Sequence, residues 1–186
     1  NWYSIQVQLP DGTPVPGCKI NGLTPATGSG SVITNSNGYA FGKAANSNPS
    51  LTAVSPYFDY SNVSASVPQT SAITSHVFTL TEKALSFPIQ MTGTQKVRFS
   101  PKFGLVDMFL VGGGGSGAIC SGMTTCSTGG GGGFTQTVKI DLSDKEVQFT
   151  IGSGGSPVSS SNSGSFQNQN GNSGGSTSVV ITGGKT

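Results

Sequence analysis

Charged side chains are scarce in this sequence of 186 residues. Lys, Arg, Asp and Glu together make up 9% of it, against about a quarter in an ordinary soluble domain. Nine basic and seven acidic residues give a net charge of +2 and are scattered along the chain. Nucleic-acid binding is therefore not expected, because it requires a clustered basic surface.

Hydrophobic residues are also few and never form a long run. They make up 33% of the chain, and nowhere do they reach the roughly 18 consecutive positions that a membrane-spanning helix requires. No membrane span is expected. Glycine is the residue in excess, with 29 positions, so side chains able to fill a core are limited.

Residues that carry chemistry are sparse as well. The single histidine, His76, lies in an alternating segment at 75–80, and we expect it at the edge of a β-sandwich or partly in its core. No serine or cysteine has a base at a plausible spacing, and no pair of carboxylates shares a strand. We therefore expect no enzymatic activity, no cofactor and no metal site.

The three cysteines, Cys18, Cys120 and Cys126, are too few for a disulfide framework. Cys120 and Cys126 enclose five residues, and a disulfide between them and two free thiols are both compatible with this spacing. A zinc site would need four ligands. Cys18 is expected to be a small buried side chain.

The first half of the chain alternates between apolar and polar residues over short segments. In the first of them, Tyr3, Ile5, Val7 and Leu9 share one face. Turn sequences rich in Gly, Pro and Asn separate the segments, a spacing typical of an antiparallel β-sandwich. The predicted strands are 3–9, 15–20, 31–34, 39–42, 50–54, 61–67 and 75–80.

Four aromatic residues of this half admit two interpretations. Trp2, Tyr57, Phe58 and Tyr60 could form a platform that stacks on sugars. Because the chain is poor in aliphatic residues, we expect them to supply the core instead.

Two phrases in this half carry a resemblance to a known family. Residues 5–20 read IQVQLPDGTPVPGCKI and residues 34–40 read TNSNGYA. Together they resemble the immunoglobulin-like modules of the CnaB and carboxypeptidase-regulatory type, which implies a hairpin followed by a turn into a core strand. The resemblance is informative about fold and says almost nothing about function.

Clusters of glycine punctuate the second half, at 112–115, 129–133, 152–155, 171–175 and 183–184. Strand-like segments separate them, which flexible linkers rarely contain. We expect the glycines to pack at one end of a β-sandwich, backbone against backbone, with polyglycine helices as one possible arrangement. The run at 112–117 is not followed by a helix, so a phosphate-binding loop is not expected.

The strands of this half are predicted from alternation. Residues 105–111 should form a buried strand in which Asp107 accepts a hydrogen bond from a backbone N–H. Phe134, Val138 and Ile140 should share one face, and 134–140 should pair with 147–151 as a hairpin through the polar turn 141–146.

Four phrases of the second half, kept in order, carry a second resemblance. Residues 99–117, 129–135, 147–156 and 171–178 resemble the glycine-rich modules of bacteriophage tail fibre, baseplate and other virion appendage proteins. The resemblance implies a distal, extracellular, often trimeric module, in some cases an adhesin that binds the host. The insert between Cys120 and Cys126 departs from the usual loop, which ends in glycine alone.

We therefore predict an all-β chain, with an immunoglobulin-like sandwich at 1–83 and a glycine-rich β-sandwich domain at 84–186, a piece of a longer polypeptide. The predicted function is a non-enzymatic structural and host-attachment module on a virion surface. Its expected partners are other virion proteins, further copies of itself (a trimer being favoured) and a host glycan or protein. A bacterial surface adhesin or glycan-binding module is the alternative. The candidate binding loops are 116–128 and 153–172, with Ser116, Ile119, Met123, Thr125, Ser153, Ser156, Phe166 and Asn170 as candidate contacts.

Overall fold

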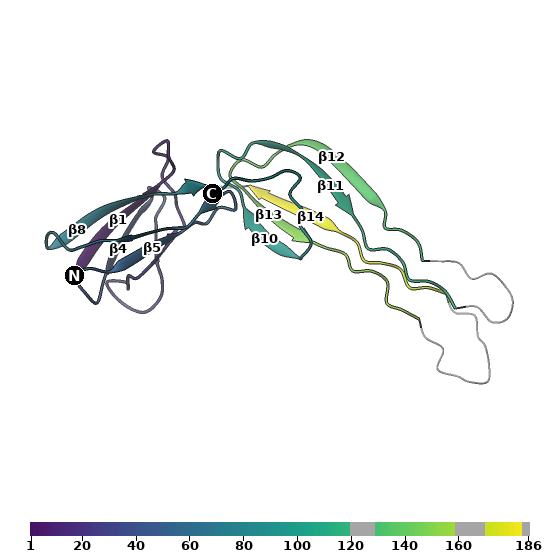
Figure 1. The fold of residues 1–186 in the computed structure, drawn as a ribbon, viewed down its shortest axis with the longest axis horizontal. Helices are drawn as coiled ribbons and strands as arrows, with labels where there is room; N and C mark the ends of the chain where they lie inside the picture. The colour runs from purple at the N-terminus through teal and green to yellow at the C-terminus, as the bar shows by residue number, and fades with distance from the viewer. Residues whose placement is uncertain (120–128, 159–169, 184–186) are drawn as a thin grey trace. The chain divides into compact units, whose positions relative to one another are not determined.

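The computed structural model describes residues 1–119, 129–158 and 170–183, and the chain divides into two compact units, Asn1–Phe87 and Pro88–Thr186. The predicted boundary lay four residues earlier, after residue 83. The described residues contain strands and no helix (Figure 1), which confirms the all-β prediction. Accordingly, no described segment forms a helix of the length and apolarity that crossing a membrane requires.

The first unit consists of two main sheets and one short strand pair. One sheet has the order β4-β1-β8, in which β1 pairs antiparallel with β4 and parallel with β8; the other has the order β3-β2-β5-β7. The strands are β1 (Trp2–Gln8), β2 (Lys19–Asn21), β3 (Val32–Ile33), β4 (Tyr39–Lys43), β5 (Ser50–Val54), β6 (Tyr60–Ser61), β7 (Val63–Ser66), β8 (Ile73–Thr79) and β9 (Thr81–Glu82), with β6 paired to β9.

One hydrophobic core joins the two sheets. Alternation along β1 places Tyr3, Ile5 and Val7 inside, as predicted. Side chains of β2 and β5, among them Ile20 and Leu51, belong to the same buried cluster. The first unit is therefore a β-sandwich whose core forms between the inner faces of both sheets.

The predicted turns are present and explain their glycines. Gly12 has φ 86° and donates its N–H to the Leu9 carbonyl at 2.9 Å. Gly38 has φ 76° and donates to the Asn35 carbonyl at 2.9 Å, and a Cβ at this position would lie 2.6 Å from the carbonyl oxygen of Val7. Gly38 therefore meets both a conformational and a steric requirement for glycine.

The second unit also holds two sheets. Its strands are β10 (Gln95–Arg98), β11 (Leu105–Val111), β12 (Phe134–Asp141), β13 (Lys145–Thr150) and β14 (Ser178–Gly183). One sheet has the order β10-β13-β14 and the other contains β11 and β12, all antiparallel.

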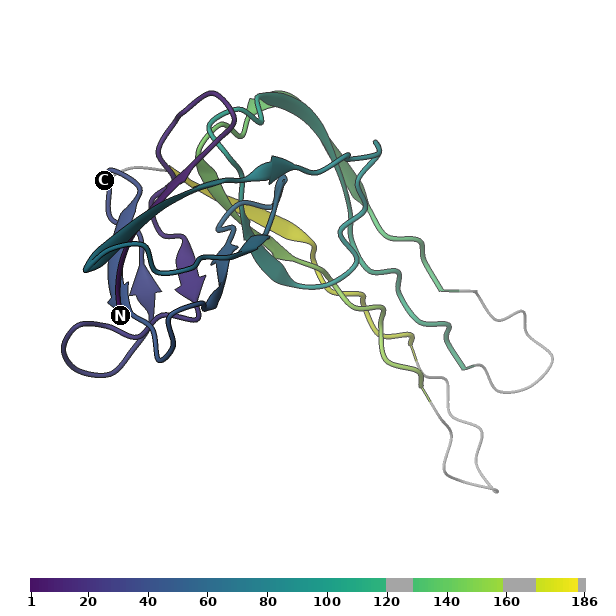
Figure 2. The ribbon, with the colours of Figure 1, turned by 60° about the vertical axis from the view of Figure 1, so that its left-hand side comes forward.

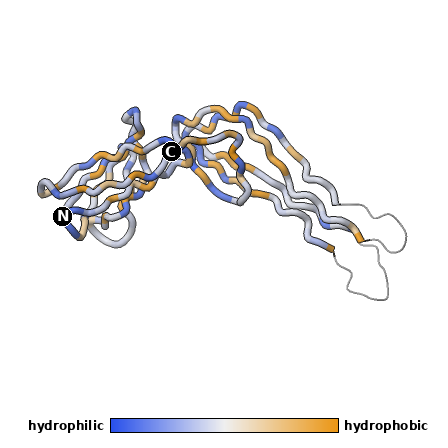
Figure 3. The backbone as a smooth tube through the Cα atoms, viewed as in Figure 1, coloured by the Kyte–Doolittle hydropathy of each residue, from blue (hydrophilic) through white to orange (hydrophobic). Residues whose placement is uncertain are grey.

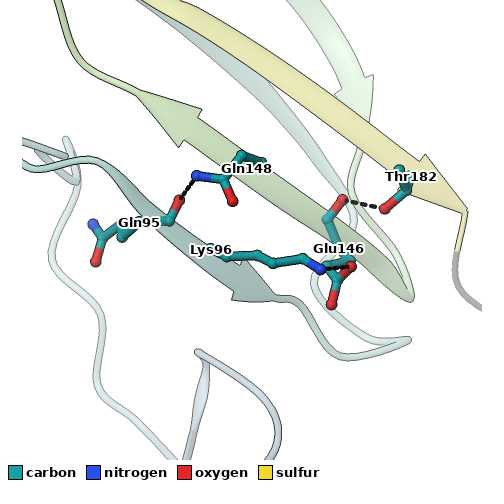
Figure 4. Close-up of polar contacts among 5 residues, drawn as sticks. All are labelled: Gln95, Lys96, Glu146, Gln148 and Thr182. Atoms are coloured by element: carbon teal, nitrogen blue, oxygen red, sulfur yellow. Dashed lines mark hydrogen bonds and ion pairs between the residues drawn. The ribbon is translucent and has the colours of Figure 1, made fainter.

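Side chains cross-link the three-stranded sheet on its exposed side (Figure 4). Lys96 forms an ion pair with Glu146 at 2.6 Å, and Gln148 donates its side-chain N–H to the Gln95 carbonyl at 3.2 Å. Thr182 donates its hydroxyl to the carbonyl of Glu146 at 3.2 Å. These contacts tie β13 to both of its neighbours.

The predicted hairpin between 134–140 and 147–151 is wrong. β12 pairs with β11, whereas β13 pairs with β10 and β14. The connection changes sheet because Leu142 is buried and its N–H bonds the Gly104 carbonyl at 3.0 Å, while the Asp144 N–H bonds the Ser100 carbonyl at 3.0 Å. Anchoring to the segment before β11 therefore outweighs the local turn.

A β-bulge in β12 corrects a second prediction. The β11–β12 register shifts between Val106 and Met108, and Lys139 has φ 54°. Asp107 accepts the Lys139 N–H at 2.9 Å, as expected of its carboxylate. The extra residue moves Ile140 to the half-buried side, so it does not share a face with Phe134 and Val138.

The prediction of a buried strand at 105–111 is correct about the strand and wrong about its burial. One side of β11, with Val106, Met108 and Leu110, is half-buried. On the other side Leu105, Phe109 and Val111 are 66%, 61% and 50% exposed. An apolar run in the sequence does not reveal which face finds a partner.

Candidate functional site: a glycine bundle

Four glycine-rich segments continue from one end of the second unit's strands. Residues 112–116 follow β11, 129–133 precede β12, 152–156 follow β13 and 171–175 precede β14. Both ribbon views show them running side by side away from the strands (Figures 1 and 2). We refer to these four segments as the glycine bundle.

The segment 112–116 lies at the centre of the glycine bundle and bonds the other three. It contacts 129–133 through Gly112 N–H to Gly133 O at 2.9 Å and Gly115 N–H to Gly130 O at 2.8 Å. It contacts 171–175 through Gly113 N–H to Gly175 O and Ser116 N–H to Asn172 O, both at 2.9 Å. It also accepts the Gly155 N–H at the Gly114 carbonyl, at 2.8 Å.

A further backbone bond closes the set, from the Gly175 N–H to the Ser153 carbonyl at 2.7 Å. The expectation that the glycines pack backbone against backbone at one end of the strands is thus confirmed. Their polar groups pair between segments, because no regular strand ladder continues here.

Close contacts recur every third residue in the outer segments. At Gly129 and Gly132, Gly152 and Gly155, and Gly171 and Gly174, a Cβ would come closer than 3.0 Å to backbone of a neighbouring segment. A Cβ at Gly113 in the central segment would likewise lie too close to the backbone of Ser153. A period of three is that of a polyproline-II-type helix, and glycine at every third position of such a helix is what permits close packing.

Space and not backbone conformation requires these glycines. The positive φ values at described glycines occur at seven positions from Gly12 to Gly104, none of them in the glycine bundle. Serine and asparagine stand between the closed positions, at Ser153, Asn172 and Ser173. Side chains are thus tolerated where the helix faces outward and are excluded where it faces a neighbour.

Polar side chains close the two ends of the glycine bundle. Ser116 accepts the Asn172 N–H at its hydroxyl at 2.8 Å, and the Asn172 amide donates to the Ser156 carbonyl at 2.9 Å. At the strand end, Thr177 accepts the Gly152 N–H at 3.0 Å and donates to the Val111 carbonyl at 2.6 Å. These bonds connect the segments 112–116, 152–156 and 171–175.

A shallow groove of about 350 Å³ lies where the strands pass into the glycine bundle. Its lining is mainly backbone, with Leu110, Thr135 and Thr177 as the larger side chains. The described residues of the glycine bundle and its flanks carry no ionisable side chain. This end of the unit therefore offers hydrogen-bonding groups and small apolar surfaces, and no charge.

The structure brings together several of the predicted contact residues. Ser116, Ser153 and Ser156 all belong to the glycine bundle, where Ser116 and the carbonyls of Ser153 and Ser156 bond neighbouring segments. Ile119 is half-buried and Asn170 is exposed, each beside the end of a bundle segment. Met123, Thr125, Phe166, Cys120 and Cys126 lie outside the described residues.

The remaining candidates of the sequence lie in the first unit. His76 stands on the edge strand β8 and packs edge-on against Phe78 with 4.6 Å between ring centroids. Burial lowers the pKa of its imidazole, so it is neutral at physiological pH. Among the described residues, no group of three His, Cys, Asp or Glu side chains is placed to bind a metal.

An exposed aromatic cluster on β4-β1-β8 was not anticipated in this form. Tyr57 and Tyr60 are buried, as expected of core residues. Trp2 instead stacks on Phe41, with centroids 5.2 Å apart and planes 7° apart, beside Lys43. Tyr39 and Phe41 are each 47% exposed. Their alternation in the segment 39–43 was visible in the sequence, but the pairing with Trp2 required the sheet register.

Comparison with known proteins identifies the second unit. A model of the glycine-rich domain family matches residues 90–186, about half of the chain. No curated protein matches the sequence. Among solved structures, the one described as the structure of the Streptococcal ancillary pilin is similar at 10% identity and a TM-score of 0.38. That similarity covers 100% of this chain, which spans 59% of the pilin chain.

Proposed function

The chain belongs to the glycine-rich domain family, and from this membership and the glycine bundle we propose that it is a non-enzymatic structural and attachment module of a surface appendage. The appendage we favour is that of a phage virion, because four phrases of the second unit resemble such proteins in order. The first unit would serve as a spacer and the second would present binding loops. The module would assemble with other virion proteins and with further copies of itself, a trimer being favoured.

The observation that carries the proposal is the way the glycine bundle holds two loops. The connections 117–128 and 157–170 leave from the same end of the glycine bundle, whose segments are fixed by backbone hydrogen bonds. A loop on a rigid base can change its sequence without disturbing a core. Such a base suits recognition that must vary with the host.

Polyvalency would provide the affinity. One loop pair without charged groups in its base makes a weak contact, and copies on one appendage would multiply it. Because recognition would depend on hydrogen bonds and apolar contacts, we expect it to be insensitive to salt.

Removal of one loop tests the proposal. Deletion of residues 119–126 should leave the glycine bundle paired and the chain folded, and should weaken binding of the labelled chain to bacterial cells, measured by co-sedimentation with a panel of strains. Ile33→Ala, at an exposed position of β3, is the control and should bind as the wild type does. Equal binding by the deletion variant and the wild type would contradict the proposal.

A second candidate function, glycan binding by a surface adhesin, is favoured by the aromatic cluster on β4-β1-β8. Trp2, Tyr39 and Phe41 lie on the same sheet face as Ser4 and Gln6. Aromatic rings stack on the C–H faces of sugars, and amide and hydroxyl groups can bond sugar hydroxyls. Loss of cell binding in Trp2→Ala and Phe41→Ala, together with unchanged binding by the loop-deletion variant, would favour this candidate over the first.

A further inference from the structure

Among the described residues of the second unit, the β11–β12 ribbon carries the largest unpartnered apolar face. Leu105, Phe109 and Val111 of β11 and Phe134 and Val138 of β12 are 50–70% exposed. Val111 stands opposite Phe134 in the register, and Phe109 stacks on Phe134 with centroids 5.2 Å apart. We call these five residues the apolar ribbon face.

The apolar ribbon face gathers several exposed apolar side chains in one place. Hydrophobic residues are scarce in the sequence, and yet five of them, two of which are phenylalanines that stack on each other, lie exposed on one two-stranded ribbon. The other side of the ribbon, with Val106, Met108 and Leu110, is half-buried, so the exposed side is the one that lacks a partner. In Figure 3 the strands of this ribbon show hydrophobic colour, in contrast to the pale glycine bundle that continues from them.

The size of the face fits a protein interface. Each phenylalanine leaves roughly 100–150 Å² exposed, and the five side chains together roughly 500 Å². An apolar patch of this size matches the largest patch of a typical soluble protein, which is often functional. A stable interface buries roughly 800 Å² per partner, which the five residues and their polar rim can supply.

The composition of the face indicates what kind of partner covers it. Interfaces between independent proteins are about as polar as the rest of the surface, whereas interfaces between identical subunits resemble a core cut in half. Leu, Val and Phe dominate this face, in which Gln136 stands opposite Phe109. Its central carboxylate, Asp107, already accepts the Lys139 N–H at 2.9 Å. Lys139 and Asp141 are the other charged residues of the ribbon. Asp141 lies at its end and accepts the Ser143 N–H at 2.9 Å.

We propose that the apolar ribbon face is the surface through which this chain associates with a second copy of itself. This proposal specifies the surface for the self-assembly that is part of the proposed function, and it depends on that self-assembly. Because the glycine bundle continues directly from β11 and β12, copies joined here would hold their binding loops close to one another. Such clustering provides the polyvalency that weak single contacts need.

Sedimentation velocity of the whole chain over a range of concentrations tests the interface. We expect the wild type to reach a mass of two or more copies and Phe109→Ser/Phe134→Ser to remain a monomer. Ile33→Ser/Val77→Ser is the matched control, since it removes two side chains of similar exposure, 54% and 48%, from the first unit. It should associate as the wild type does. A wild type that stays monomeric at the highest concentration, or a double variant that keeps its mass, would overturn the proposal.

A second measurement covers the case in which the serine variant does not fold. Phe134→Trp, in a Trp2→Phe background, places one indole on the face and keeps its apolar character. Its emission should shift to shorter wavelength over the same concentrations at which the mass rises. An emission maximum that does not move while the mass rises would place the interface elsewhere. Retained cell binding by the monomeric double variant would leave the interface standing and would contradict polyvalency as the source of affinity. A wild type that stays monomeric and still binds cells would refute the interface and leave the loop-based attachment standing.

Discussion

Gly132 packs so closely on the carbonyl oxygen of Gly112 that no Cβ could stand between them. Three residues earlier, Gly129 has the same relation to Gly115. The two contacts, one turn of a polyproline-II-type helix apart, lock the outer segment 129–133 onto the central one. Gly130, Gly131 and Gly133, by contrast, face open space.

The two kinds of glycine should respond differently to alanine. Gly132→Ala should lower the free energy of unfolding of the second unit by about 1–3 kcal/mol, because it forces two backbones apart. Gly131→Ala, the matched control, should be neutral or stabilise by about 0.4–1 kcal/mol, since it only restricts the unfolded chain. Urea unfolding followed by far-UV circular dichroism measures both. Equal losses in the two variants would contradict the packing of the segments.

Conformation at the bulge gives a second prediction. Lys139 has φ 54°, a region in which a β-branched residue is a genuine outlier. Lys139→Val should therefore destabilise the second unit by about 1–2 kcal/mol, and Lys139→Gly should be neutral or mildly stabilising. Thermal unfolding distinguishes them. Thr137→Val, two residues away in β12 and without a positive φ, is the control and should show neither effect.

The sequence was sufficient for those parts of the fold that depend on local pattern. The alternation of Tyr3, Ile5 and Val7 predicted the core face of β1, and Asp-Gly and Asn-Gly predicted the turns at Gly12 and Gly38. Polyglycine helices were one expected arrangement of the glycine clusters. The spacing Gly-x-x-Gly at 129–132, 152–155 and 171–174 agrees with a helix of three residues per turn, but the same spacing can arise by chance in a glycine-rich sequence.

Choices between distant partners could not be predicted in this way. The pairing of β12 with β11 instead of β13 depends on Leu142 and Asp144 bonding the segment 100–104. The exposure of Phe109 depends on which face of the ribbon another sheet covers. The Trp2–Phe41 stack needs the β1–β4 register. Each of these features depends on contacts between residues far apart in the sequence, which the alternation pattern of a single strand does not specify.

Two ion pairs between described residues of the second unit should differ in strength. Lys96 and Glu146 have side chains 57% and 40% exposed, whereas Arg98 and Asp144, paired at 2.8 Å, are 27% and 19% exposed. Lys96→Ala should change the free energy of unfolding by less than about 0.5 kcal/mol. Arg98→Ala should cost about 1–3 kcal/mol, because a partly buried carboxylate loses its partner. High salt should leave this difference largely in place.

His76 makes the stability of the first unit depend on pH. The ordinary pKa of histidine is 6.5, and burial beside Phe78 holds the folded-state pKa below it. Between the two values the unfolded chain binds more protons, so the free energy of unfolding rises with pH. The stability that the neutral imidazole contributes is fully present at pH values above the pKa of His76 in the unfolded chain. It is lost as the pH falls through the pKa of His76 in the folded chain.

Chemical unfolding of the first unit at pH 7.5 and at pH 5 should therefore show the wild type less stable at the lower pH. His76→Gln removes the titrating group and should flatten this part of the profile, while retaining a polar side chain at the same position of β8. Glu82→Gln provides the control for carboxylates in the same unit, and its profile should keep the histidine-dependent slope. A His76→Gln profile as steep as that of the wild type would assign the pH dependence to another group.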